Sequence, residues 1–138
     1  MTSYRLGPVR DARARDENAS RGELADTIAD ATRAQAAVAV ADRRIEAARA
    51  RVDDAAAAAE GVAGRLALAD RYRERLRHEL ELACVERERL AGAHRDRQAE
   101  VDRARGRFAW ARARKQVVER HFERWRDEQR KLAERRQD

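Results

Sequence analysis

The sequence predicts an all-α fold, a long antiparallel two-helix coiled-coil hairpin that forms a single domain over residues 1–138. Apolar residues recur every three or four positions along most of the chain, two glycines stand near its middle, and bulky apolar side chains are few. We expect a first arm over residues 9–60, a turn over 61–64 and a second arm over 65–136.

Composition argues against a rounded hydrophobic core. Asp, Glu, Lys and Arg make up 42% of the residues, against about 25% in typical globular proteins, and only 4% are aromatic. Alanine dominates the apolar share, and Ala, Arg, Glu and Leu are strong helix formers. The single proline, Pro8, lies near the start, so nothing after it forbids a helix. A narrow seam between helices suits this composition better than a globule.

The first arm carries the more regular heptad pattern. Sustained apolar a and d positions are typical of a coiled coil, and alanine at most d positions predicts closely spaced helices. An alanine-rich sequence could match by chance, but Leu, Ile and the larger Val residues fall mainly on one heptad position. The a positions are Leu24, Ala31, Val38, Ile45, Val52, Ala59 and Leu66, and the d positions are Thr27, Ala34, Ala41, Ala48, Ala55, Val62 and Ala69.

The second arm continues the alternation by four and three with a rougher seam. Long arginine side chains there could lie along the seam and send the guanidinium group to water. Its apolar members are Leu76, Leu80, Ala83, Leu90, Val101, Ala104, Phe108, Ala111, Val118, Phe122, Trp125 and Leu132, and its polar members are Arg73, Arg87, His94, Arg97, Lys115 and Gln129.

Gly61 and Gly64 predict the turn between the arms, because glycine readily adopts the left-handed conformation that ends a helix. The alternative is one unbroken helix that pairs as an extended dimer, since the heptad register does not slip across this segment. Gly92 and Gly106 are further candidate bends. The second arm is the longer one, so its C-terminal end should overhang.

The positive charge is concentrated at that end. Residues 103–138 contain 13 Lys and Arg against 6 Asp and Glu, a net charge of +7, whereas residues 1–102 contain 19 against 20, a net charge of −1; together they give the +6 of the whole chain. We expect the basic character to be a local property of the second arm.

Residue patterns for catalysis are weak. His78-Glu79 resembles the start of a zinc-protease helix, but Leu82 stands where the second histidine would be. Glu17 and Arg21, four residues apart, are most simply a solvated surface pair. No phosphate-binding glycine loop is present, and we expect a protein that is not an enzyme and takes no metal, cofactor or small-molecule substrate.

The localisation expected from the sequence is the cytoplasm. The N-terminal residues lack the apolar stretch of a signal peptide, and no apolar run approaches the roughly 20 residues that span a bilayer. A single cysteine, Cys84, cannot form an internal disulfide, and we expect it to be a packed or partly exposed thiol.

Residues 113–131 form the strongest candidate for a functional site. Val118, Phe122 and Trp125 make a bulky apolar stripe flanked by arginines, and aromatic residues and arginine are enriched at binding hot spots. The alternative is that these residues pack against residues 1–10 of the first arm. Nucleic-acid binding is a weaker possibility, because acidic residues interrupt the basic stretch every few positions. His121 is interpreted as incidental surface.

The chain resembles the FliJ/YscO family, the stalk proteins of flagellar and type III secretion export machines, including Hrp-type variants. The resemblance rests on length, the two-arm pattern, residues 112–119 with a Lys-x-x-x-Glu element at Lys115 and Glu119, and the segments 123–125 and 134–138. Alanine richness, Trp110 and Trp125 depart from the family's usual sequence.

This resemblance implies a non-enzymatic central stalk that enters the pore of a hexameric export ATPase, promotes its activity and links it to the export gate in the membrane. Binding of export chaperones is also implied, as is a cytoplasmic place beside the secretion apparatus, with a role in virulence for some systems. The alternative function is a basic coiled-coil scaffold or nucleic-acid-binding protein that dimerises. The candidate ATPase contacts are Arg112, Arg114, Lys115, Glu119, Arg120, Phe122, Arg124, Trp125 and Arg126.

Overall fold

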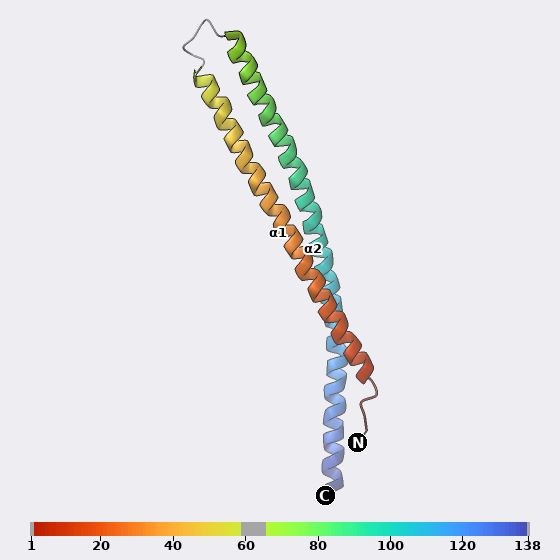
Figure 1. The fold of residues 1–138 in the computed structure, drawn as a ribbon. Coiled ribbons are helices and arrows are strands. Elements are labelled where there is room, and N and C mark those ends of the chain that lie inside the picture. Colours follow the sequence, from red (N-terminus) through yellow and green to blue (C-terminus); the bar gives the residue numbers. More distant parts are fainter. Residues whose placement is uncertain (1, 59–65, 138) are drawn as a thin grey trace. The chain divides into compact units, whose positions relative to one another are not determined.

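Two α-helices make up the structure, a computed structural model that describes residues 2–58 and 66–137. Helix α1 spans Gly7–Ala58 and α2 spans Leu66–Gln137 (Figure 1). The expected turn at residues 61–64 lies outside the described residues. Contacts divide the chain into a terminal unit, Met1–Ile28 with Glu100–Asp138, and a middle unit, Ala29–Ala99. Each unit consists of a stretch of α1 packed against a stretch of α2.

The start of α1 shows why its only proline is tolerated. The backbone N–H of Gly7 donates to the carbonyl of Tyr4 at 3.0 Å, and that of Arg10 donates to the carbonyl of Leu6 at 2.9 Å. Pro8 falls in the first turn, where backbone N–H groups have no partner inside the helix, so proline removes no helical hydrogen bond there.

At the C-terminal end of α2, Arg135 and Arg136 place positive charge in the last turn, where it interacts favourably with the helix dipole.

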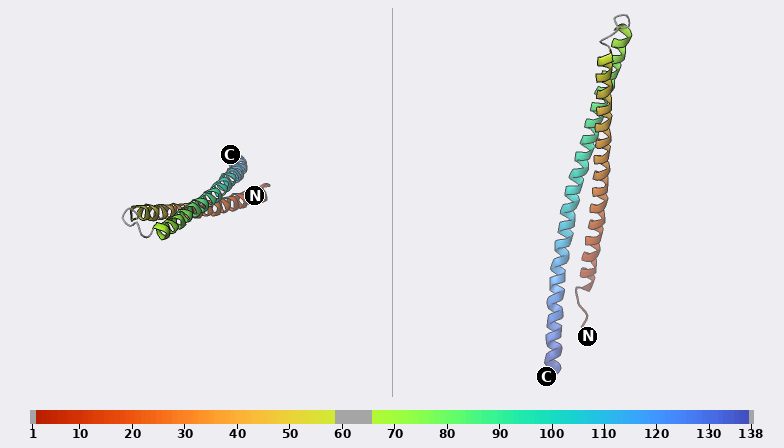
Figure 2. Two further views of the ribbon diagram at one scale, coloured as in Figure 1. Left: turned by 90° about the horizontal axis from the view of Figure 1, so that it is seen from above. Right: turned by 90° about the vertical axis from the view of Figure 1, so that its left-hand side faces the viewer.

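In the terminal unit, small and β-branched residues of α2 form the most buried part of the interface. Ala104 is 1% exposed, Val101 is 2% exposed, and Ala111 is also buried. On α1 the heptad positions Leu24 and Thr27 are half-buried. The views in Figure 2 agree that these stretches of α1 and α2 lie side by side. Alanine has a side chain small enough for two helix backbones to come close at such a contact.

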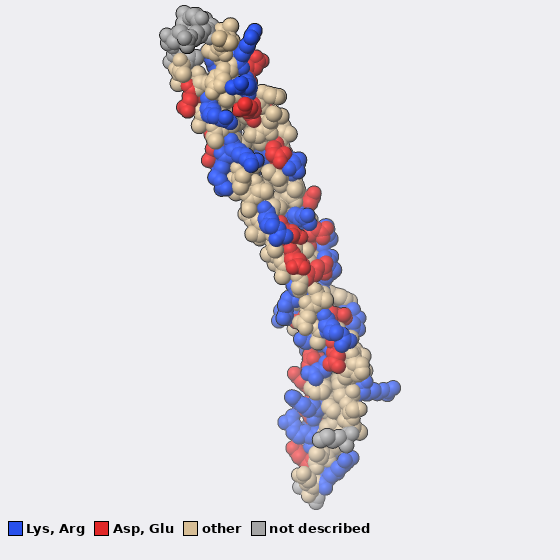
Figure 3. Space-filling model, in the orientation of Figure 1, with Lys and Arg blue, Asp and Glu red and all other residues tan. Residues whose placement is uncertain are grey.

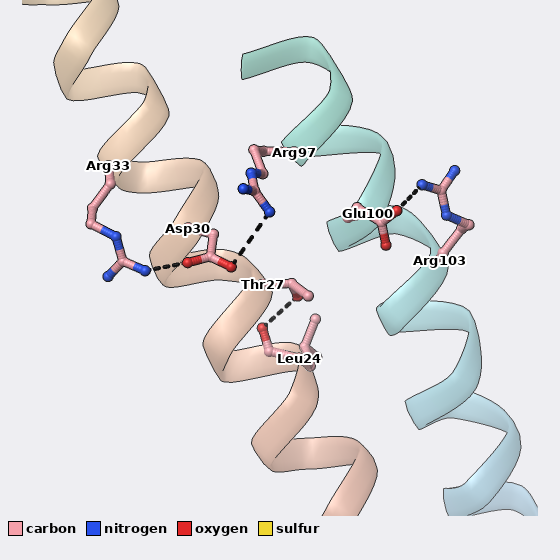
Figure 4. A network of polar contacts seen from close by, with 7 residues as sticks. All are labelled: Leu24, Thr27, Asp30, Arg33, Arg97, Glu100 and Arg103. Atoms are coloured by element: carbon pink, nitrogen blue, oxygen red, sulfur yellow. Dashed lines mark hydrogen bonds and ion pairs between the residues drawn. The ribbon is translucent and has the colours of Figure 1, made fainter. Parts of the chain in front are cut away.

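In the middle unit, the described a and d positions of α1 are likewise less exposed than most of their neighbours, with Ala31, Ala41 and Ala48 buried. On α2, Leu76 and Ala91 are buried. In Figure 4 the Asp30 carboxylate lies between Arg33 of its own helix and Arg97 of α2. Cross-helix ion pairs join Asp30 to Arg97 at 3.8 Å, Asp42 to Arg87 at 2.9 Å and Arg51 to Glu79 at 3.5 Å.

The residues predicted to form the second seam are buried or half-buried with two exceptions, Leu132 and Arg97, whose side chains are exposed. Arg73 departs from the expectation that seam arginines reach water. Its Nη2 lies 3.4 Å from a carboxylate oxygen of Asp70, and its Nε is buried without a hydrogen-bond partner among the described residues. Helix α2 runs through the candidate bends at Gly92 and Gly106 without a break.

Replacing Ala104 by leucine should destabilise the protein by about 1–3 kcal/mol, because three added carbon atoms have no room at a 1% exposed position. The free energy of unfolding is measured by urea titration followed by circular dichroism. The same substitution at exposed Ala109 of α2 is the control and should change that free energy by less than about 0.5 kcal/mol. Equal effects of the two variants would contradict a close helix contact at Ala104.

Candidate partner-binding site

All nine residues predicted to contact a partner lie on α2 within the terminal unit, and they separate into two groups. Four contact α1 or the segment before it: Lys115, Glu119, Phe122 and Trp125. Five are exposed: Arg112, Arg114, Arg120, Arg124 and Arg126. The five arginines are therefore open to solvent, while Phe122 and Trp125 are engaged within the chain.

An aromatic cluster ties the N-terminal segment to α2. The ring of Tyr4 lies 5.1 Å from that of Phe122 in an edge-on arrangement and 5.1 Å from that of Trp125, while Phe122 and Trp125 stack at 5.8 Å. The Tyr4 hydroxyl and Nδ1 of His121 share a hydrogen bond at 2.9 Å. The sequence left open whether this stripe packs on residues 1–10, and the structure shows such packing for Phe122 and Trp125. His121, though exposed, is part of this contact.

Arg10 links the aromatic cluster to a carboxylate. Its Nε donates to Glu119 at 2.8 Å and its Nη2 donates to the second oxygen of the same carboxylate at 3.1 Å. The guanidinium group also lies 4.0 Å from the centre of the Phe122 ring. A two-pronged Arg–carboxylate contact combined with a cation–π contact fixes the side chain's orientation. The hydrogen bonds from Arg10 lower the pKa of Glu119.

Glu17 is the buried polar residue of the interface, which makes the prediction of a solvated Glu17–Arg21 pair wrong. The residue is only 5% exposed. Its carboxylate accepts a hydrogen bond from Arg21 of α1 at 2.7 Å and lies 3.1 Å from Nζ of Lys115 on α2. The hydrogen bond from Lys115 lowers the pKa of Glu17, and the nearby charges of Arg21 and Arg112 act in the same direction. Two basic partners offset the cost of removing this carboxylate from water.

A longer heptad frame would have found these residues in the sequence. Counting back by sevens from Leu24 places Glu17 and then Arg10 at a positions, on the same face as the apolar seam. Lys115 is already on the predicted seam of the second arm, so a carboxylate on the facing side of the first arm is the partner to look for. Tyr4 lies before the helix begins, and no helical periodicity could have identified it.

The exposed group forms a basic surface on α2. Among the residues that the structure describes, Arg114, Arg120, Arg124 and Arg126 make no ion pair, whereas Arg112 lies near enough to Glu17 to affect that carboxylate. Basic side chains project from the part of the molecule that contains the two termini (Figure 3). Unpaired guanidinium groups at a surface are available to carboxylates of another molecule.

Acidification should weaken the interface of the terminal unit. Glu17 and Glu119 both have a pKa lowered from the usual value of about 4.5, so each contributes stability above that pH. This stability is lost as the pH falls below 4.5 and both carboxylates take up protons. The free energy of unfolding, measured by urea titration at pH 7, 4.5 and 3, should fall most steeply between pH 4.5 and pH 3.

The double variant Glu17→Gln with Glu119→Gln should be less stable at pH 7 and should show a shallower fall below pH 4.5. The double variant Glu123→Gln with Glu128→Gln is the control, because both of those residues are exposed. An acid dependence that is unchanged in the first double variant would mean that other carboxylates carry it.

Replacing Tyr4 by alanine should lower the free energy of unfolding by about 1–3 kcal/mol, because the variant loses contacts with both Phe122 and Trp125. Tyr72→Ala is the matched control, since Tyr72 is 47% exposed and belongs to no aromatic cluster among the described residues, and its effect should be less than half as large. Tryptophan fluorescence reports the same contact, because the emission of Trp125 should shift to longer wavelength in Tyr4→Ala only.

Other parts of the described chain offer less for chemistry. No group of three or more His, Cys, Asp or Glu side chains is placed to hold a metal ion in residues 2–58 and 66–137, and Cys84 is an exposed free thiol. Neither helix contains a stretch apolar and long enough to cross a membrane.

No family model, curated protein or solved structure matches the chain.

Proposed function

We propose that this chain is a non-enzymatic central-stalk and coupling protein of a bacterial type III secretion export apparatus. In this role it binds a hexameric export ATPase and links it to the export gate, from a cytoplasmic position beside the membrane-embedded machine. The supporting observation concerns residues 112–126 of α2. Glu119, Phe122 and Trp125 contact the N-terminal part of the chain, while a row of arginines on the same helix stays exposed.

The fold that we propose for this role is an antiparallel two-helix coiled coil. The order of the cross-helix contacts supports it, because partner numbers on α2 fall as residue numbers on α1 rise. In the terminal unit the pairs run from Arg10 with Glu119 to Glu23 with Arg107. In the middle unit they run from Asp30 with Arg97 to Arg51 with Glu79. The less exposed a and d positions of both helices support the same arrangement.

The C-terminal end of α2 supports insertion of this helix into the narrow pore of a partner. Residues 130–137 are exposed throughout, and Thr2, the first residue that the structure describes, donates a hydrogen bond to Gln129 just before them. A single basic helix is slim enough to enter a ring of subunits, whose polar or acidic lining would attract it. Salt should weaken such an attraction, because it screens charges between exposed groups. Contacts with the gate and with export chaperones belong to the same proposal.

A basic scaffold that dimerises and binds nucleic acid is the second function considered. The five exposed arginines favour it, but Glu123 lies among them, Asp127 and Glu128 follow directly, and these carboxylates would repel a phosphate backbone. Binding to duplex DNA that falls steeply with salt, together with a dimeric mass in solution, would support this function and not the stalk.

The exposed arginines provide the test of the stalk proposal. The export ATPase of the same organism should hydrolyse ATP faster when this chain is added, and Arg120→Glu with Arg124→Glu should reduce that stimulation by about tenfold or more. Both residues are exposed and unpaired among the described residues, so helicity by circular dichroism should be unchanged.

The control is a second charge reversal, Arg71→Glu with Arg77→Glu, on exposed positions of α2 in the middle unit. This variant has the same net charge and should stimulate the ATPase as the natural chain does. The stalk proposal is wrong if the natural chain neither binds the ATPase nor changes its rate. Equal loss of ATPase stimulation in the two double variants would show that only net charge matters. That result would contradict a binding site at residues 112–126.

A further inference from the structure

A short apolar stripe on α2 stays exposed in the terminal unit. Gly106, Trp110, Ala113 and Val117 follow one another at spacings of four, three and four, which is the spacing of a helix-pairing seam. All four are exposed, Trp110 to 67% and Val117 to 64%. Tryptophan and valine side chains are usually much more buried than this. The stripe is separate from the seam that faces α1, where Ala104 and Ala111 are buried.

A groove between the two helices adjoins this stripe. It has a volume of about 320 Å³, and Ala19 and Ser20 of α1 line it together with Trp110 and Ala111 of α2. The small side chains leave room beside the indole ring, and at Gly106 an added Cβ would meet nothing within 4 Å. A helix laid along the stripe could therefore place one side chain over Gly106 and another beside Trp110 without displacing either helix.

The rim of the groove has more basic than acidic side chains. Arg13, Arg107 and Arg114 line it against a single carboxylate, that of Asp16. Asp16 lies 3.4 Å from Arg13, and Arg107 is engaged with Glu23 at 2.6 Å. Arg114 makes no ion pair among the described residues. An occupant with acidic residues beside its apolar face would complement this rim, whereas a basic one would be repelled.

We propose that the Trp110 stripe, defined as Gly106, Trp110, Ala113 and Val117, binds an acidic amphipathic helix of another protein. Its spacing selects a helix, its exposed tryptophan provides the anchor that binding hot spots favour, and the arginine rim selects acidic flanks. A second copy of this chain fits less well. If the stripes of two copies packed together, Arg107 and Arg114 of one copy would lie near Arg107 and Arg114 of the other. Nucleic acid fits less well because the middle of the surface is apolar.

This site goes beyond the stalk proposal, since it names a surface and an occupant that do not depend on an ATPase. The probe is a synthetic peptide of four heptads with leucine at a and d and glutamate at e and g. A second peptide has glutamine in place of every glutamate. Binding of each labelled peptide to the full chain is measured by fluorescence anisotropy at low salt, in the absence of any ATPase.

The acidic peptide should bind, and the glutamine peptide should bind at least about tenfold more weakly. Trp110→Ala and Arg114→Glu should each weaken binding of the acidic peptide about tenfold or more. The matched controls lie in the middle unit: Leu82→Ala removes another exposed apolar side chain, and Arg71→Glu reverses another exposed charge. Both controls should bind within about twofold of the natural chain. Circular dichroism of each variant verifies that the helices remain folded.

The proposal is wrong if the acidic peptide does not bind, if the two peptides bind equally, or if Trp110→Ala binds the acidic peptide within twofold of the natural chain. It is also wrong if Trp110→Ala abolishes self-association or duplex DNA binding, because the stripe would then belong to one of those occupants. Loss of ATPase stimulation in Arg120→Glu with Arg124→Glu has no bearing on these results, so the two proposals can fail separately.

Discussion

Burial of a thin, alanine-rich interface is the constraint on which each unit depends. A side chain as small as alanine removes little apolar surface from water, so each helix must contribute many such positions to form a stable contact. Close approach of the backbones compensates for the small side chains, because more atoms come within van der Waals distance. The same thinness leaves little room for change at Ala104 or Ala41, where a larger side chain would separate the helices.

Periodicity predicted the helices well because it reports directly on which face is buried. The described a positions from Leu24 to Val52 are all at least half-buried, and the two helices begin and end within two residues of the predicted arms. Leu132 was the apolar exception. It lies beyond Gln129, which bonds to Thr2, so α1 supplies no surface to cover it. Periodicity describes one helix and contains no information on where its partner ends.

The candidate site was only partly predictable for a related reason. Sequence alone identified the aromatic and basic residues of the tail, yet it left open whether Phe122 and Trp125 faced a partner or the chain's own N-terminus. Tyr4 decides between these, and it lies in a non-helical segment more than a hundred residues away in the sequence. Glu17 was misread because local spacing to Arg21 suggested a surface pair, whereas its position on the heptad governs its burial.

The charged residues of the interface also fix how α1 and α2 align in the terminal unit. An alanine seam alone would tolerate a slip of one heptad, because another alanine would follow. A slip of seven residues would move the Glu17 carboxylate from Lys115 to Phe108 or Phe122, and would move Arg10 from Glu119 to Arg112 or Arg126. Either displacement removes a carboxylate's partner or brings two guanidinium groups together. These two ion pairs therefore favour a single register of α1 against α2 in the terminal unit.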